Sequence, residues 1–201
     1  MSEDEEERNI KIILLGETSV GKTAIINRYI NNEFNEESRS TFGASFATKA
    51  VKIDKIKYLL NVWDTSGQEK YHSLNNLFIN GSDIVILVYS IISKISFEGL
   101  DYWYKTIKEK LEDDKYILAI IGNKGDLVEN EIIPEEKAKE FAEEKNAIFK
   151  IVSAKEDPGG INALFNHLLN EFIKNKKYEI RAESVIIQRP IKAKKEKRGF
   201  C

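Results

Sequence analysis

Residues 16–23, Gly-Glu-Thr-Ser-Val-Gly-Lys-Thr, combine the residue types that bind a chain of phosphate groups. Gly16 and Gly21 allow the backbone to bend so that successive N–H groups face an anion, and a helix that starts directly afterwards adds the positive end of its dipole. At the end of the motif, Lys22 can reach the outer phosphates and the Thr23 hydroxyl can bind Mg²⁺. The motif therefore predicts a nucleotide site, without indicating which base is bound. The other predicted phosphate-binding residues of this loop are Thr18, Ser19 and Val20.

The segments beside this loop are the ones that such a site requires. Residues 10–15 are mostly apolar and β-branched, which predicts a buried strand, and residues 24–30 have the pattern of a helix. A strand, a glycine-containing loop and a helix in this order form the setting in which the motif binds phosphate. The alternative is an ordinary turn with a surface lysine, which leaves this setting unexplained.

Composition predicts one globular domain with a charged segment at each end. A chain of 201 residues with 42% hydrophobic content can bury one sizeable core. We expect the domain to span residues 9–177, after an acidic, disordered segment of residues 1–8 and before a flexible basic segment of residues 178–201. The net charge of −2 argues against nucleic acid as a partner.

Cys201 is the only cysteine, so no disulfide can form within the chain. No stretch approaches the roughly 18 to 20 apolar residues that span a bilayer, and the acidic first residues lack the features of a signal peptide. We expect a monomer in the cytosol that reaches a membrane only after modification.

Apolar runs along the chain predict an α/β fold. Residues 84–89 and 116–121 are continuously apolar, which is typical of parallel strands covered on both faces. Residues 56–62 alternate instead and follow a polar turn, which predicts a hairpin with the preceding strand. Apolar residues at helical spacing lie between the strands, and Ser96 is placed to cap one of these helices. We therefore predict a three-layer α/β sandwich with about six strands, one of them antiparallel, and about five helices.

Asn123 and Asp126 follow the apolar run 116–121, at the edge where parallel sheets bind ligands. A carboxylate can accept two N–H groups from the Watson–Crick edge of guanine, whereas adenine presents a lone pair there. Each hydrogen bond to a charged group is worth about 1.5–3 kcal/mol, so the pair gives a preference for guanine of roughly a hundredfold or more. The alternative, a turn rich in Asn, Gly and Asp, would by itself explain these residue types.

Three further motifs follow the phosphate loop in order, namely Asp-Thr-Ser-Gly-Gln at residues 64–68, Asn-Lys-Gly-Asp at 123–126 and Ser-Ala-Lys at 153–155. Together with the phosphate loop they resemble the small GTPases of the Ras superfamily over residues 10–175. This resemblance implies the small G-protein form of the P-loop NTPase fold, GTP and GDP as ligands, Mg²⁺ as the metal and hydrolysis of GTP as the reaction.

Other segments resemble the Rab family within that superfamily. These are residues 41–46, 63–74 and 135–143, and the Gly-Ala-Ser-Phe sequence at 43–46 is nearest to the early-endosomal branch. The resemblance implies a GTP/GDP switch that recruits effectors in intracellular vesicle and membrane traffic.

The same resemblance assigns roles to individual residues. Thr41 would complete the Mg²⁺ shell and sense the γ-phosphate, Asp64 would hold the metal through water, and Gly67 would donate its N–H to that phosphate. Catalysis would rest on Lys22, Thr41 and Gln68, with Gln68 orienting the attacking water. The residues expected around the base, beside Asn123 and Asp126, are Phe34, Lys124, Ser153, Ala154 and Lys155.

The sequence departs from the family pattern at several positions. Ser66 stands where alanine is usual, which puts a hydroxyl near the γ-phosphate and Mg²⁺ and can change hydrolysis in either direction. Thr18 and Ser19 add side-chain bulk to the phosphate loop, and Asn80 replaces an arginine of the Rab second switch.

Two features of the sequence imply partners. Phe46, Trp63 and Phe78 match an aromatic triad that Rab proteins present to effectors. Cys201 behind a basic run resembles the prenylated anchors of Rab proteins, although the sequence Arg-Gly-Phe-Cys matches none of the usual prenylation motifs. The implied partners are an exchange factor, a GTPase-activating protein, effectors and a prenyl-binding chaperone, at the cytoplasmic face of an endomembrane such as the early endosome.

Two other functions remain open at this point. A nucleotide-locked interaction module would bind GTP or GDP without turnover, and Ser66 keeps this alternative open. A Ras-like signalling GTPase at the plasma membrane is opposed by the lack of a C-a-a-X ending, and a phosphate-loop kinase is excluded by the Asn-Lys-x-Asp motif.

Overall fold

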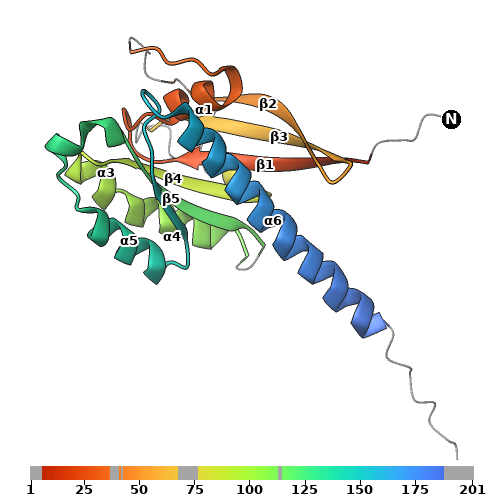
Figure 1. The fold of residues 1–201 in the computed structure, drawn as a ribbon. Coiled ribbons are helices and arrows are strands. Elements are labelled where there is room, and N and C mark those ends of the chain that lie inside the picture. Colours follow the sequence, from red (N-terminus) through yellow and green to blue (C-terminus); the bar gives the residue numbers. More distant parts are fainter. Residues whose placement is uncertain (1–5, 37–40, 42, 68–76, 113–114, 188–201) are drawn as a thin grey trace, which may run out of the picture.

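A computed structural model describes residues 6–36, 41, 43–67, 77–112 and 115–187, with side chains described up to residue 176. Its centre is a six-stranded sheet in the order β2-β3-β1-β4-β5-β6, in which only the β2–β3 pair is antiparallel. This confirms the predicted α/β sandwich (Figure 1). The strands are β1 (Glu7–Leu15), β2 (Ala44–Ile53), β3 (Ile56–Thr65), β4 (Ile84–Ser90), β5 (Ile117–Asn123) and β6 (Ile148–Ile151).

Helices cover both faces of the sheet. On one face α1 and α6 pack over the first hydrophobic core, and on the other α3, α4 and α5 pack over the second (Figure 1). A 3₁₀ segment, η2, follows β5, and residues 77–79 form a helical turn before β4. The helices are α1 (Lys22–Asn31), α3 (Lys94–Glu98), α4 (Leu100–Lys110), η2 (Gly125–Asn130), α5 (Glu135–Glu144) and α6 (Pro158–Ile187).

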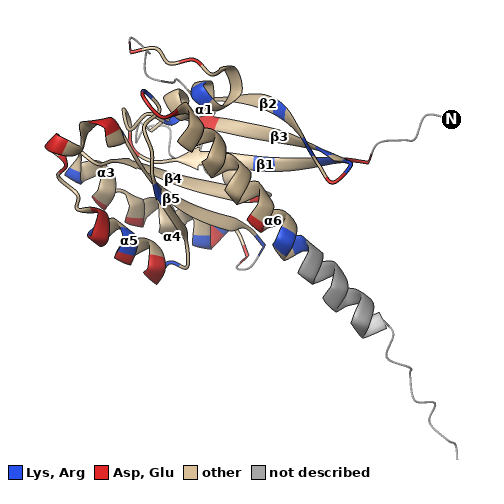
Figure 2. Cartoon of the chain, viewed as in Figure 1, with Lys and Arg blue, Asp and Glu red and all other residues tan. Residues whose placement is uncertain are grey.

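The central strands are apolar throughout because successive side chains enter different cores. In β1, Ile12 and Leu14 belong to the core beneath α1 and α6, whereas Ile13 and Leu15 belong to the core beneath α3, α4 and α5. Neither β4 nor β5 contains a charged residue, and both are tan in Figure 2. Burying each such aliphatic side chain stabilises the fold by about 1.5–3 kcal/mol, so these strands fix the sheet whose ends carry the loops.

The predicted hairpin is confirmed as β2 and β3. Its turn consists of Asp54 and Lys55, which have φ values of 50° and 70° and therefore lie in the left-handed region. Two such residues form the turn whose twist matches an antiparallel pair. In β3 the alternation predicted from the sequence places Tyr58, Leu60 and Val62 in the core.

The predicted cap at Ser96 is wrong. Helix α3 begins at Lys94, and the Ser93 side chain caps it by accepting a hydrogen bond from the Ser96 N–H at 3.3 Å. Ser96 is buried inside the helix, where its hydroxyl accepts from the Ser90 N–H at 3.0 Å and donates to the Ser93 carbonyl at 2.8 Å. Serine is a favoured capping residue, so the sequence alone allowed either position. Ser93 becomes the cap because the Ser96 hydroxyl is engaged in a buried hydrogen bond with Ser90 of β4.

Regular structure extends past both predicted limits of the domain. Strand β1 begins at Glu7, inside the segment 1–8 predicted to be disordered, because Glu7 pairs with Lys57 of β3 and forms an ion pair with it at 2.8 Å. Helix α6 continues to Ile187, beyond residue 177, and runs past the edge of the sheet in Figure 1. Within the described chain, helices that combine the length and the apolarity needed to cross a membrane are absent.

Candidate nucleotide-binding site

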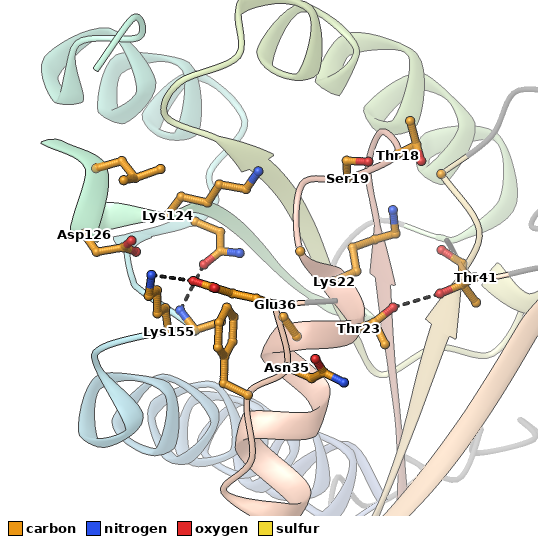
Figure 3. A pocket seen from close by; sticks show the side chains of 18 residues that line it. Thr18, Ser19, Lys22, Thr23, Asn35, Glu36, Thr41, Lys124, Asp126 and Lys155 are labelled. Carbon is orange, nitrogen blue, oxygen red and sulfur yellow. Dashed lines mark hydrogen bonds and ion pairs between the residues drawn. The ribbon is translucent and has the colours of Figure 1, made fainter. Parts of the chain in front are cut away.

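A cavity of about 450 Å³ lies at the carboxyl ends of the strands. It is bordered by the phosphate loop after β1, by residues 34–36 after α1, and by the segments that follow β5 and β6 (Figure 3). Most of the residues predicted to bind the nucleotide line this cavity or contact the residues that do. Its volume suits a small-molecule ligand.

Lys22 is held inside the phosphate loop. Its ammonium group donates to the carbonyls of Gly16 at 2.7 Å and Glu17 at 2.8 Å, and only 5% of the residue is exposed. Burial lowers the pKa of Lys22 to about 8, and the negative charges of Asp64 and Glu17 offset part of that effect. The outer phosphates of a nucleotide would give this buried cation a stronger partner than two neutral carbonyls.

The two glycines of the motif are required by close contacts as well as by conformation. Gly16 has φ 141°, and a Cβ atom there would lie 2.1 Å from the Val88 carbonyl oxygen. Gly21 has φ 96°, and a Cβ atom there would lie 2.3 Å from Nδ2 of Asn123. The loop therefore touches both β4 and the residue that ends β5, which the motif alone did not indicate.

The three predicted metal-binding residues meet at one carboxylate oxygen, and Figure 3 shows the contact between two of them, Thr23 and Thr41. The Thr23 hydroxyl donates to Oδ2 of Asp64 at 2.7 Å, the Thr41 hydroxyl donates to the same oxygen at 3.2 Å, and the two hydroxyl oxygens are 2.8 Å apart. The other carboxylate oxygen, Oδ1 of Asp64, is buried and has no hydrogen-bond partner among the described residues. Burial also raises the pKa of Asp64, against the lowering effects of the bond from Thr23 and the charge of Lys22.

These features fit a bound Mg²⁺. The ion prefers oxygen ligands and keeps several waters, so that one or two protein groups together with substrate phosphates complete its shell. Two hydroxyls and a carboxylate with an unused buried oxygen supply ligands of this kind.

Gly67 lies directly against the phosphate loop. A Cβ atom at Gly67 would lie 2.3 Å from the carbonyl carbon of Glu17 and from the nitrogen of Thr18, so only glycine fits. Beside it, Ser66 is 1% exposed and donates its N–H to the Gly43 carbonyl at 2.9 Å. Gln68 lies outside the described residues, and its predicted role stays a prediction.

Asn123 is bonded within the protein rather than directed only at a base. Its Nδ2 donates to the Val20 carbonyl at 2.8 Å, and its Oδ1 accepts from the Ala154 N–H at 3.2 Å. Ala154, which the family resemblance places beside the base, thus donates its N–H to Asn123 in this structure. Asn123 therefore ties the phosphate loop to the loop after β6.

Asp126 lines the cavity and is oriented by a neighbour from that same loop. Its Oδ1 accepts a hydrogen bond of 2.5 Å from the Ser153 hydroxyl, whose oxygen in turn accepts from the Glu156 N–H at 2.9 Å. Lys124, which also lines the cavity, adopts the left-handed conformation with φ 66°. The family resemblance assigns Ser153 to the surroundings of the base, and in the structure its hydroxyl is bonded to Asp126.

Two residues at this end of the cavity were missed by the sequence analysis. Glu36 forms a 2.6 Å ion pair with Nζ of Lys155 (Figure 3). Both residues line the cavity, as does Phe34. This pair raises the pKa of Lys155. The second missed residue is Arg28 of α1, whose side chain donates to two backbone carbonyls of the loop that contains Lys155. No local pattern could reveal these contacts, because more than a hundred positions of the chain separate the partners.

The three aromatic residues predicted as an effector surface form one stack. The ring centroids of Phe46 and Trp63 are 5.3 Å apart, and those of Trp63 and Phe78 are 5.1 Å apart. Phe46 is 62% exposed, whereas Trp63 and Phe78 are half-buried against the core. Lys11 supports the stack from β1, with its ammonium group 5.3 Å from the Trp63 ring and bonded to the Asn80 carbonyl at 2.7 Å.

Comparison with known proteins identifies the family. The sequence pattern of the Ras family matches residues 11–174. The chain is 35% identical to the Ras-related protein Rab11B of Nicotiana tabacum over 86% of its own length and 79% of that protein. It is 34% identical to the Ras-related protein RABA1e of Arabidopsis thaliana over 85% of its own length and 77% of that protein. A phosphate loop, a magnesium-type oxygen cluster and the Asn123–Asp126 segment around one cavity agree with these matches, and the chain belongs to the Ras family as a small GTPase of the Rab group.

Proposed function

We propose that this GTPase is a GTP/GDP switch whose GTP form recruits effectors in vesicle traffic. The observation that supports it most is the meeting of Thr23, Thr41 and Asp64 at one oxygen. Thr41 precedes β2, so a group that binds at this point can fix or release the segment that leads to the effector surface. A nucleotide that has lost its γ-phosphate offers Thr41 fewer contacts, and this difference is what a switch of this kind uses.

The residues of the cavity divide the work of binding and hydrolysis. Thr23 and Thr41, with Asp64 through water, would hold Mg²⁺, which when bound neutralises charge on the phosphates. Lys22 binds the outer phosphates, and Asp126 accepts the two N–H groups of the guanine edge. Hydrolysis needs no covalent nucleophile, because positioning of a water by Gln68 and stabilisation of charge provide nearly all of the catalysis.

Competition and single-turnover measurements test this function. We expect GDP and GTP to bind in the presence of Mg²⁺ at least a hundredfold more tightly than ATP, and Asp126→Ala to remove most of that preference. Intrinsic hydrolysis should be slow, on the order of 10⁻⁴ to 10⁻² per second as in Ras-type GTPases without a helper protein, and Gln68→Leu should slow it further with little change in affinity. Equal displacement by ATP and GTP would contradict the guanine assignment, and the absence of measurable turnover would favour a nucleotide-locked module.

We propose the aromatic stack as the effector surface. Phe46 is largely exposed, while Trp63 and Phe78 are fixed by the core behind them, so a partner would meet a rigid apolar face. Phe46→Ala should lose capture of GTP-dependent effectors by about 2 kcal/mol or more without lowering the melting temperature. Trp63→Ala should lose the same binding and also some stability, because Trp63 contacts both other rings. Unchanged effector capture by both variants would limit the stack to packing.

Membrane association would use the basic segment together with Cys201. A prenyl group on Cys201 and attraction of the six basic residues in 189–198 to anionic lipid would supply the two signals that stable anchoring requires. Exchange factor, GTPase-activating protein and prenyl-binding chaperone follow from this cycle, and the Gly-Ala-Ser-Phe sequence favours the early endosome. Mass spectrometry of the protein expressed in its own cells, with Cys201→Ser as the control, would detect the lipid or exclude it.

A further inference from the structure

Arg28 joins two parts of the nucleotide site that are far apart in the sequence. Its Nε donates to the Ala154 carbonyl at 2.9 Å, and its Nη2 donates to the Lys155 carbonyl at 3.0 Å. A third nitrogen, Nη1, donates to the carbonyl of Asn32, the C-cap of α1, at 2.8 Å. One half-buried guanidinium therefore connects α1 and its end to the loop after β6.

The loop that Arg28 holds is also held on its other side. The Ala154 N–H is bonded to Asn123, and the Ser153 hydroxyl is bonded to Asp126. Arg28 thus fixes the carbonyl groups of this loop, while Asn123 and Asp126 engage its N–H and hydroxyl groups. Ala154 and Lys155 both line the cavity, so Arg28 supports a wall of the site from behind.

The geometry requires arginine rather than any cation. Adjacent carbonyls of Ala154 and Lys155 receive separate N–H groups from one planar group, which a lysine ammonium on a flexible stem cannot reproduce with the same directions. The aromatic ring of Phe34, another residue of the cavity, lies 6.0 Å from the centre of the same guanidinium. The other end of α1 carries Lys22 and Thr23, so the phosphate-binding and base-binding parts share one rigid helix.

We propose that Arg28 is a positioning residue for the guanine base. It holds residues 153–155 so that Ser153 keeps the Asp126 carboxylate in the orientation that reads the guanine edge. This inference rests on the proposed guanine site and adds to it a residue that touches no part of the nucleotide itself. Loss of Arg28 should then speed nucleotide release and weaken the reading of the base.

Release rates of GDP and inosine diphosphate test this inference. Inosine diphosphate lacks the 2-amino group that Asp126 would bind, so the ratio of the two release rates reports how well Asp126 reads the base. We expect Arg28→Met to speed GDP release about tenfold, as for the loss of one hydrogen bond to a charged group. The ratio of the two release rates should shrink about threefold, because Asp126 is then less well oriented toward the 2-amino group. Arg28→Lys should fall between wild type and Arg28→Met, because lysine can serve one of the two carbonyls.

Arg8→Met provides the matched control. Arg8 is 42% exposed at the start of β1 and is bonded to the nearby Glu6, so both release rates should equal those of wild type. If Arg28→Met speeds the release of both nucleotides equally, or leaves both unchanged, Arg28 has only a structural role and the inference is wrong. If Arg28→Met does not fold, the ratio for Arg28→Lys decides in the same way. A wild-type protein that binds ADP as well as GDP would instead overturn the guanine site, and this inference with it.

Discussion

The two ends of the nucleotide cavity are built differently. At the phosphate end, the side chains expected to meet the ligand are bonded to other groups of the protein. Lys22 donates to two carbonyls of its own loop, and both threonines donate to Asp64. At the base end, the bonds of Asn123 join loops behind the cavity wall. Ligand binding must exchange the first set of bonds for new ones, whereas the second set can persist. The phosphate end therefore provides the responsive part of the site, and the base end provides a preorganised frame.

The strongest test of this contrast is removal of the buried cation. Lys22→Met deletes the group that exchanges its carbonyl partners for phosphate, so GDP affinity should fall by roughly a hundredfold or more. The ligand-free variant should melt at the same temperature as wild type or higher, because a buried charge has been replaced by an apolar side chain of similar length. Fluorescence titration with a labelled GDP and a thermal melt give the two values. A large loss of stability with normal affinity would reverse the roles assigned to the two ends.

A smaller loss of nucleotide affinity is expected when the hydrogen bonds of Asn123 at the base end are removed. Asn123→Ala removes the bonds to Val20 and Ala154 and leaves their buried backbone groups without that partner. This should cost about 1–3 kcal/mol of stability, and the melting temperature should fall by roughly 2–4 °C for each kcal/mol. Because Asn123 holds the phosphate loop, affinity for GDP and for ADP should both fall by about tenfold. A loss confined to GDP would show that Asn123 acts mainly on the base, and the frame would then be smaller than described.

The smallest expected effect is a dependence of affinity on pH. The Lys22 pKa of about 8 in the ligand-free protein lies below the ordinary lysine value of 10.5, and contact with phosphate should raise this pKa again. Nucleotide binding then takes up a proton above pH 8, so affinity should be flat below that value and fall by about fivefold between pH 8 and 9. The free energy of unfolding of the ligand-free protein should change in the opposite direction. The unfolded state holds more protons on Lys22 between pH 8 and 10.5, so stability from this group rises with pH in that window.

Lys22→Met separates this effect from other titrations. The variant should lose both the decline in affinity and the gain in stability over the same pH range. Titrations of GDP at pH 7, 8 and 9, with wild type and variant side by side, measure the difference. An equal decline in both proteins would assign the pH dependence to another group.

Much of this site could be predicted from sequence because its key residues lie in short motifs next to strands. The phosphate loop follows β1, and Asp64 lies at the end of β3. Runs of apolar residues identify these two strands even when their pairing partners are not known. Parallel pairing then brings the strand ends together, which places Thr23 beside Asp64. The phosphate-loop motif predicted Thr23 as a metal ligand and the family resemblance added Thr41 and Asp64, and the structure brings these three residues together.

The frame behind the base could not be predicted in the same way. Arg28 and Glu36 bond to residues 153–155, and such contacts depend on how α1 packs against α6 rather than on any local spacing. The sequence identified Asn123 as a site residue but not its hydrogen bonds to Val20 and Ala154. An amide side chain can bond to a base or to backbone groups equally well, so the residue type alone does not distinguish the two. The choice between Ser93 and Ser96 as a cap failed for a related reason, since it depended on a buried contact with β4.

The contact between Gly21 and Asn123 restricts how this sequence can change. Any side chain at position 21 would meet the Asn123 amide at 2.3 Å and would also adopt an unfavourable φ of 96°. Replacing Asn123 first by a shorter residue would make room for a side chain at position 21, but it would remove the hydrogen bond to the Val20 carbonyl. Each single step is costly, because a side chain at position 21 clashes with Asn123 and a shorter residue at position 123 weakens both stability and nucleotide binding. We therefore expect the two positions to be retained together.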